Sequence, residues 1–207
     1  MLRIWGRMSS INVRKVVFTA QWLGVPFERI DAGAAFGIVQ TPEFLAKNFN
    51  AMIPLLEEDD GFTLWESNVI VRYLAARHAA GTLYPQDLRE RFDAERWMDW
   101  QQTTLNPAGR DAFVQMIRVA PQERSRAKID ASITATEPLL DALDAQLASR
   151  PFIAGQQLTM ADIPIACEMH RWAGLPITHK SRPALQRWYD GICKLPAARG
   201  VLDIELS

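Results

Sequence analysis

The stretch that decides the fold is Trp65-Glu66-Ser67-Asn68, taken together with Ile53-Pro54 twelve residues earlier. An acidic and a hydroxyl residue stand side by side where a short strand gives way to a helix. A helix N-terminus offers unpaired backbone N–H groups and a positive dipole end to a carboxylate, and the adjacent Glu66 can take an ammonium group. The junction can therefore hold the charged amino-acid end of a small peptide. Because a hydroxyl residue before a helix is also ordinary N-capping, the surrounding sequence must decide between the two readings.

The composition is that of an ordinary soluble globular chain. Its 207 residues are 48% apolar and 23% charged, which suits one large domain or two small ones. The formal net charge is −1, and the segment up to Pro85 holds 8 basic and 8 acidic residues, so no part of the chain is strongly basic. Neither nucleic acid nor an anionic membrane is therefore expected as a partner.

The cellular compartment is predicted from the length of the apolar runs and from the positions of the cysteines. The first residues form too short an apolar run for a signal sequence, and no run of about 18 apolar residues exists, so we expect a cytoplasmic protein without a membrane span. Cys167 and Cys193 lie far apart within apolar helical patterns. They are expected to be buried free thiols rather than parts of a disulfide framework.

The first 81 residues alternate between strand and helix patterns. Strands are expected at 2–5, 26–30, 54–57 and 62–65, the last two joined by the turn Glu58-Asp59-Asp60-Gly61. Helices are expected at 12–23, 41–47 and 67–79, with Ser67 capping the third. This order, βαβαββα, predicts a small α/β domain.

After Tyr84-Pro85 the strand signals stop and helical patterns continue to the end of the chain. Helices are expected at 87–106, 121–148, 163–172 and 182–195, with Pro138 kinking or splitting the second. Thr159-Met160-Ala161-Asp162 is close to a capping box, with Asp in the place of Glu or Gln. The apolar segment that it opens, Ile163 to Trp172, is expected to lie at the centre of this part.

Three motifs, in order, resemble those of the cytosolic glutathione transferases of bacterial, serine type. Residues 48–54 resemble the segment that leads into the cis-proline of that family, and residues 64–74 resemble its glutamyl-binding motif. Residues 152–163 resemble the motif that starts a helix of its second domain. The resemblance covers nearly the whole chain. It implies a thioredoxin-like domain at 1–81, an all-helical domain at 88–207, a homodimer, and glutathione as co-substrate.

The resemblance also implies where glutathione binds. Pro54 cannot donate to a strand ladder and holds Ile53 extended, so the N–H and C=O of Ile53 can pair with the glutathione cysteine as an added strand. Glu66 and Ser67 are implied to hold the γ-glutamyl ammonium and carboxylate. Gln40 aligns with a position that binds the glycine end in related enzymes, although the contacts to that end stay open.

The reaction needs the glutathione thiolate at neutral pH. A free thiol has a pKa of about 8.5, and each unit of depression requires about 1.4 kcal/mol of stabilisation of the anion. A hydroxyl donor or a helix N-terminus provides this. The loop before the first helix carries Ser9 and Ser10; the Ser-x-Asn pattern favours Ser10 as the thiol donor with Asn12 in support, and an alignment to classes with two adjacent serines favours Ser9. The loop holds no cysteine and no tyrosine, which argues against the cysteine-type and tyrosine-type classes.

The second substrate is expected between the two domains. The candidate wall residues, on the first helices of the second domain, are Trp97, Trp100, Thr103, Asn106, Phe113 and Met116. This mostly apolar set predicts a small hydrophobic electrophile and no metal. The leading interpretation is a glutathione transferase with a role in detoxification. The alternatives are a glutathione-dependent disulfide reductase that uses no protein cysteine, and a non-catalytic binding module of the same fold.

Overall fold

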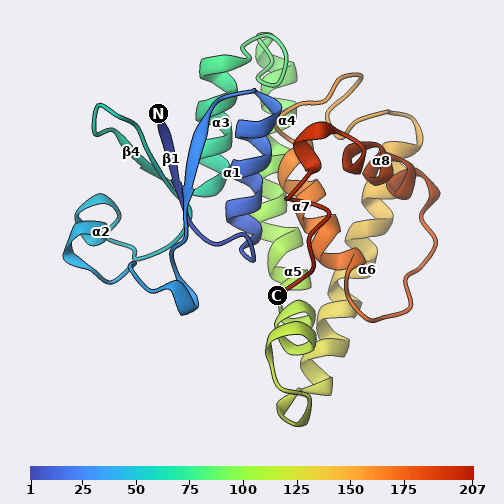
Figure 1. Ribbon diagram of the computed structural model, residues 1–207. Coiled ribbons are helices and arrows are strands. Elements are labelled where there is room, and N and C mark those ends of the chain that lie inside the picture. Colours follow the sequence, from blue (N-terminus) through green and yellow to red (C-terminus); the bar gives the residue numbers. More distant parts are fainter.

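Four short strands form the sheet of the first part of the chain (Figure 1). The computed structural model describes residues 1–207. The elements of this part are β1 (Leu2–Trp5), α1 (Ile11–Trp22), β2 (Phe27–Ile30), α2 (Pro42–Lys47), β3 (Leu55–Glu57), β4 (Thr63–Trp65) and α3 (Ser67–His78). The strand order is β2-β1-β3-β4, with β1 parallel to β2 and antiparallel to β3. The predicted α/β order βαβαββα is confirmed.

The register of the strands brings four connections to one end of the sheet. Trp5, the last residue of β1, pairs with Leu55, the first residue of β3, and Leu55 pairs with Trp65, the last residue of β4. Trp5 also pairs with the last residue of β2. The last residues of β1, β2 and β4 and the first residue of β3 therefore lie side by side at one end of the sheet. The segments that meet there are residues 6–10, 31–33, 53–54 and 66–67.

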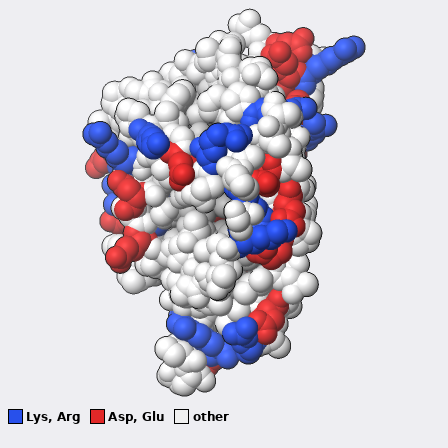
Figure 2. Space-filling view, turned by 90° about the vertical axis from the view of Figure 1, so that its right-hand side faces the viewer, with Lys and Arg blue, Asp and Glu red and all other residues white.

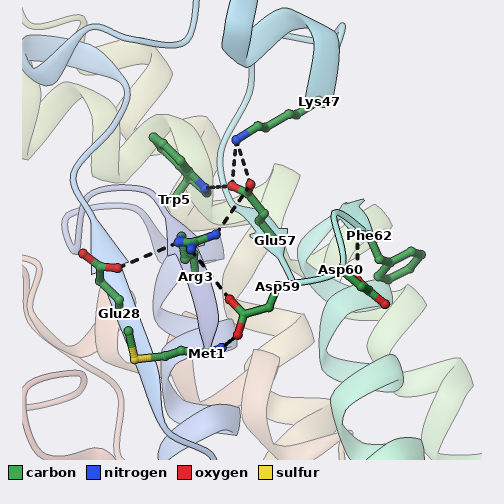
Figure 3. Close-up of polar contacts among 9 residues, drawn as sticks. All are labelled: Met1, Arg3, Trp5, Glu28, Lys47, Glu57, Asp59, Asp60 and Phe62. Atoms are coloured by element: carbon green, nitrogen blue, oxygen red, sulfur yellow. Dashed lines mark hydrogen bonds and ion pairs between the residues drawn. The ribbon is translucent and has the colours of Figure 1, made fainter.

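A carboxylate on β3 ties α2 to this sheet, as Figure 3 shows. Glu57 accepts hydrogen bonds from Trp5 Nε1 at 2.9 Å and from Lys47 Nζ at 2.9 and 2.8 Å, and Arg3 lies 3.7 Å away. Burial alone would raise the pKa of Glu57, but the hydrogen bonds from Lys47 and Trp5 lower it below the usual value. Lys47 is the last residue of α2. The network therefore fixes the start of the segment that leads to Ile53.

The second part is helical throughout, as predicted. Its helices are α4 (Leu88–Trp100), α5 (Asn106–Phe113), α6 (Arg126–Ala148), α7 (Asp162–Ala173) and α8 (Pro183–Cys193). Single π-helical turns, Gln101–Leu105 and Val114–Arg118, extend α4 and α5 into one helical run from 88 to 118. Figure 1 shows α7 beside α1, and the two helices are in contact, so one apolar core continues through both parts.

Two predicted helix boundaries are wrong. The helix expected to end at Asn106 runs on, because the π turn before Pro107 shifts the backbone hydrogen bonds and so accommodates a residue without an N–H. The helix expected from Pro121 begins only at Arg126, where Ser125 caps it and Pro121 starts a separate 3₁₀ turn. Pro138 lies inside α6 without splitting it.

The side-chain contacts of the predicted capping box are present, but α7 begins only at Asp162, with Ala161 in the capping position. Thr159 Oγ1 accepts from the Ala161 N–H at 3.3 Å, and Asp162 Oδ2 accepts from the Thr159 N–H at 2.9 Å. Asp162 Oδ1 also accepts from the Ile153 N–H at 3.0 Å and from Trp188 Nε1, on α8, at 2.9 Å. One buried carboxylate thus joins the 152–155 turn, α7 and α8. The expectation that α7 is central is confirmed, since most of its residues are buried.

The C-terminal segment folds back across α1 and α7. His170, on α7, contacts the Ile204 carbonyl through Nε2 at 2.9 Å and the Tyr189 hydroxyl through Nδ1 at 3.2 Å. Arg14, on α1, donates to the Val201 carbonyl at 2.7 Å. Burial, together with the positive charge of Arg14, lowers the pKa of His170 to about 4. The imidazole is therefore neutral in the folded protein at neutral pH.

Replacing Asp162 with Ala is expected to lower the free energy of unfolding by about 2 to 4 kcal/mol, because three buried donors lose their acceptor. Urea denaturation measures this. Asp130→Ala, which removes an exposed carboxylate paired with Arg126 on α6, is the control and should change stability by less than about 1 kcal/mol. Equal midpoints for the two variants would contradict the role assigned to Asp162.

The neutral His170 makes stability fall in mild acid. The unfolded chain takes up a proton on His170 below about pH 6.5, whereas the folded chain does so only near 4. Stability is therefore lost between these values, by at most about 1.4 kcal/mol per pH unit. Urea denaturation at pH 7 and pH 4.5 should show a smaller loss in His170→Gln than in the parent. Parallel losses in the two proteins would contradict this.

Candidate functional site

A cavity of about 320 Å³ opens at the end of the sheet where the four connections meet. Three of the predicted site residues, Ser10, Asn12 and Ile53, line it. The connection after β2 contributes Gly33 and Val39, and the helical part contributes residues from α5 and α7. The cavity therefore lies between the two parts of the chain, where the sequence placed the site.

The two adjacent serines of the loop after β1 differ in what their hydroxyls contact. Ser9 Oγ accepts a hydrogen bond from Arg7 Nη1 at 3.2 Å, and Ser9 does not line the cavity. Ser10 occupies the capping position of α1, yet its side chain makes no capping hydrogen bond. Asn12 follows in the first turn of α1, and its buried Oδ1 has no partner. The hydroxyl of Ser10 and the first N–H groups of α1 are thus available to a group in the cavity.

The Ile53–Pro54 peptide bond is cis. Neither the N–H nor the C=O of Ile53 forms a hydrogen bond within the chain, so both are free to pair with an extended peptide. Two glycines make room here: a Cβ on Gly33 would lie 3.1 Å from Ile53 Cδ1, and one on Gly6 would lie 2.4 Å from a methyl of Val13. Sequence reasoning missed both glycines, although Gly6 directly after β1 was a visible signal.

Glu66 and Ser67 lie beside Ile53 and Pro54, because Trp65 and Leu55 are paired across β4 and β3. Ser67 is buried and is the first residue of α3, so its predicted capping role is wrong. Glu66 holds the capping position instead, with a φ of 72°, and makes no side-chain capping bond. The left-handed backbone at Glu66 turns the chain from β4 straight into α3, so the helix starts one residue earlier than a capping Ser67 would imply.

The remaining predicted binding residues do not line the cavity. Glu66, Ser67 and Pro54 border the same end of the sheet without contributing to its walls. Gln40 is exposed, and its neighbour Val39 lines the cavity in its place. The structure therefore brings Ser10, Asn12 and Ile53 together and leaves Gln40 apart from them.

The apolar wall expected from the helical part is not there. Of the six candidates only Asn106 lines the cavity. Trp97 and Trp100 pack against each other with ring centroids 5.3 Å apart, and Phe113 is buried. Helical periodicity shows that such residues are buried, but it does not show against what. These apolar side chains belong largely to the core.

Arginines take the place of that apolar wall, and sequence reasoning missed them. The four that line the cavity are Arg7, Arg110, Arg118 and Arg171. No carboxylate lines it. This differs from the face drawn in Figure 2, where basic and acidic side chains lie beside one another over much of the surface. Arg110 and Arg118 lie eight residues apart on one helical run, but Arg7 and Arg171 come from distant parts of the sequence, so only the fold brings all four charges together.

Two other observations concern a second depression on the surface and the side chains that could bind a metal ion. A larger and more open depression, of about 630 Å³, lies at the opposite end of the sheet, by the turn after β3 and the end of α3. It contains none of the predicted site residues. No group of three or more His, Cys, Asp or Glu side chains is arranged to hold a metal ion.

The fold and the site define a two-part, thioredoxin-like protein with free backbone groups and an uncommitted hydroxyl at one cavity. The family models for the N-terminal and C-terminal domains of glutathione S-transferase match residues 1–76 and 105–196. The chain belongs to the glutathione S-transferase family. That finding confirms the resemblance drawn from the three sequence motifs and the predicted fold.

Among characterised relatives, the chain is 41% identical over its full length, and over the full length of the relative, to glutathione S-transferase GstB of Escherichia coli K12. It resembles the crystal structure of a theta class glutathione S-transferase from Xanthomonas axonopodis pv. citri with glutathione bound, with a TM-score of 0.95 and 40% identity over 100% of this chain and 99% of that one. A glutathione S-transferase from Pseudomonas fluorescens matches with a TM-score of 0.85 and 29% identity, over 95% and 96% of the two chains.

Proposed function

We propose that the protein is a glutathione transferase whose bound thiolate attacks a small organic electrophile. The observation that carries this proposal is the free hydroxyl of Ser10, at the start of α1, in the same cavity as the unpaired backbone of Ile53. The backbone of Ile53 can bind a peptide, and the hydroxyl of Ser10 can stabilise the sulfur of that peptide. The similar transferase that was solved with glutathione bound supports this reading.

Glutathione is proposed to bind along the end of the sheet. Its cysteine pairs with the N–H and C=O of Ile53, which Pro54 holds in place before β3. Its γ-glutamyl ammonium lies at Glu66, and its α-carboxylate lies at Ser67, where the first N–H groups of α3 have no helical partner. The glycine end is directed toward the exposed Gln40. This assignment uses the adjacency of the two segments that the pairing of β3 with β4 creates.

The thiolate is proposed to form next to Ser10. A hydroxyl that donates to sulfur favours the anion, as does the positive end of α1, and Asn12 supports the same loop. Ser10 acts as a hydrogen-bond donor and not as a base. The thiol proton leaves to solvent, the sulfur electron pair attacks the electrophilic carbon, and the leaving group departs with the bonding pair. The remaining contribution is positioning of the two reactants.

The cysteines of the protein have no place in this scheme. Neither Cys167 nor Cys193 lines the cavity. Cys167 is buried, and burial raises the pKa of its thiol to about 12. The nucleophile is therefore proposed to be the sulfur of glutathione.

We also propose that the protein acts in the cytoplasm as a homodimer and removes reactive electrophiles. The homodimer is supported by a set of exposed apolar side chains. Phe49 is 74% exposed beside Trp65, Phe92 on α4 is 60% exposed, and Val69 on α3 is 42% exposed. Side chains of this kind are typical of a surface that a second copy covers. None of the helices combines the length and apolar character needed to span a membrane.

The role of Ser10 is tested with its neighbour as a matched control. In the parent protein, bound glutathione should titrate below the free thiol value of about 8.5. Ser10→Ala should raise that pKa by about 1 to 2 units and lower kcat by about tenfold to a hundredfold, because the donor to sulfur is lost. Ser9→Ala should leave both unchanged. Thiolate absorbance in the ultraviolet and turnover of a chromogenic aryl halide give the two readouts, and the reverse pattern would transfer the role to Ser9.

The glutamyl contacts are tested by calorimetry. Glu66→Gln and Ser67→Ala should each weaken glutathione binding by about tenfold, which corresponds to about 1.4 kcal/mol. Glu90→Gln removes an exposed carboxylate on α4 and serves as the control with unchanged affinity. Undiminished affinity in both test variants would show that glutathione binds elsewhere.

A further inference from the structure

We infer that the electrophile taken by this protein carries a carboxylate, which Arg110 and Arg7 bind in the cavity that Ser10 also lines. This inference rests on the proposed transferase function and names the class of its second substrate. It starts from the four arginines of the cavity wall, which contains no carboxylate; only Arg171 has a close ion-pair partner, Glu168 behind the wall.

The positive charges act on one another across the cavity. Burial and the charges of the other three arginines lower the pKa of Arg118. Burial is the larger cause, and the three arginines that line the same cavity add to it because like charges disfavour one another. An anion placed among them would relieve this repulsion, whereas a neutral ligand would not. The cavity is therefore better suited to an anionic group than to an uncharged one.

Two of the four arginines donate hydrogen bonds to other residues of the protein. Arg171 donates from Nη1 to Asn106 Oδ1 at 2.8 Å and to Glu168 Oε1 at 3.0 Å. Arg118 donates to the carbonyls of Ser9 and Ser207, at 3.1 Å from Nη2 in both cases. These contacts hold the walls in place. They also leave fewer donors for a ligand.

The other two arginines have donors to spare. Arg110 forms no side-chain hydrogen bond, and its only ion pair, with Asp111, spans 3.9 Å. Arg7 donates from Nη1 to Ser9 Oγ, but its buried Nε has no partner. A guanidinium with free, parallel donors matches the geometry of a carboxylate. Arg110 and Arg7 are thus the groups that an incoming anion can engage.

The position of Arg110 favours the electrophile over glutathione as the source of that anion. The proposed glutamyl site is at Glu66 and Ser67, beside β3 and β4, and neither residue lines the cavity. Arg110 comes from α5, on the helical side, whereas Ile53 comes from the sheet side. A carboxylate on Arg110 therefore belongs to the group that the sulfur attacks. Contact of an arginine with the glycine carboxylate of glutathione is the alternative that the experiment must separate.

The reaction can be written for para-chloro-meta-nitrobenzoate. The glutathione sulfur forms a bond to the ring carbon that bears chlorine, the carbon–chlorine bond breaks, and chloride leaves with the electron pair. The thiol proton is released to solvent, and no oxidant or reductant is needed. The carboxylate stays on the ring, where Arg110 and Arg7 hold it. The matching benzamide has the same shape and leaving group without the charge.

The test compares the two product conjugates, S-(4-carboxy-2-nitrophenyl)glutathione and its carbamoyl analogue, by calorimetry. The parent protein should bind the carboxylate conjugate at least about tenfold more tightly, as a charge-assisted pair predicts. Arg110→Gln and Arg7→Gln should each reduce this preference by about threefold to tenfold, with the affinity for glutathione unchanged. Arg110→Lys should restore part of it, and Arg89→Gln, an exposed arginine outside the cavity, should leave it intact.

Turnover gives the second readout. Arg110→Gln should raise the KM for the benzoate by about threefold to tenfold, the same factor as its loss of carboxylate preference. It should leave kcat/KM for the benzamide unchanged. Equal binding of the two conjugates by the parent would overturn the inference while leaving the transferase function standing. Weaker glutathione binding in Arg110→Gln, with the carboxylate preference intact, would assign the arginine to glutathione and also overturn it. Failure of the parent to bind glutathione at all would instead reject the proposed function.

Discussion

The pairing of Trp5 with Leu55, and of Leu55 with Trp65, is the constraint on which the rest of the site depends. Because β1 and β4 end where β3 begins, the loop after β1, the segment before β3 and the start of α3 all reach one end of the sheet. The register of a strand decides which face its side chains occupy, since a slip of one residue would turn every side chain to the other face. The positions of Ser10 and of the free backbone groups of Ile53 follow from this register.

The site joins two kinds of physical chemistry that the two parts of the chain supply separately. The sheet part offers backbone groups and a helix N-terminus, which are neutral and fixed in direction. The helical part offers three of the four guanidinium groups, which reach the cavity from α5, the π turn after it and α7, and Arg7 in the loop after β1 adds the fourth. The buried contacts of Asp162 and the folded-back C-terminal segment hold α7 in place, and the bond from Arg171 to Asn106 joins α7 to α5. The position of the charges therefore depends on packing far from the cavity.

Much of the fold and part of the site follow from the sequence. The hairpin turn 58–61 and the capping box at Thr159 and Asp162 are local signals, so the elements around them could be placed. The arginine cluster could not, because its members come from the loop after β1, the helical run 88–118 and α7, and no local pattern joins these three segments. The sequence shows that Phe113 is apolar, but not that its side chain is buried in the core. The difference between Ser9 and Ser10 depends on a contact with Arg7 that a sequence does not display.

The most direct measurement of the central claim is amide hydrogen exchange at Ile53, followed by NMR with and without glutathione. The account predicts that the Ile53 N–H, which has no partner in the free protein, becomes protected when the peptide pairs with it. Saturation with glutathione that leaves the exchange rate of this amide unchanged would contradict the account, because the tripeptide would then be held by something other than the exposed backbone of the sheet end.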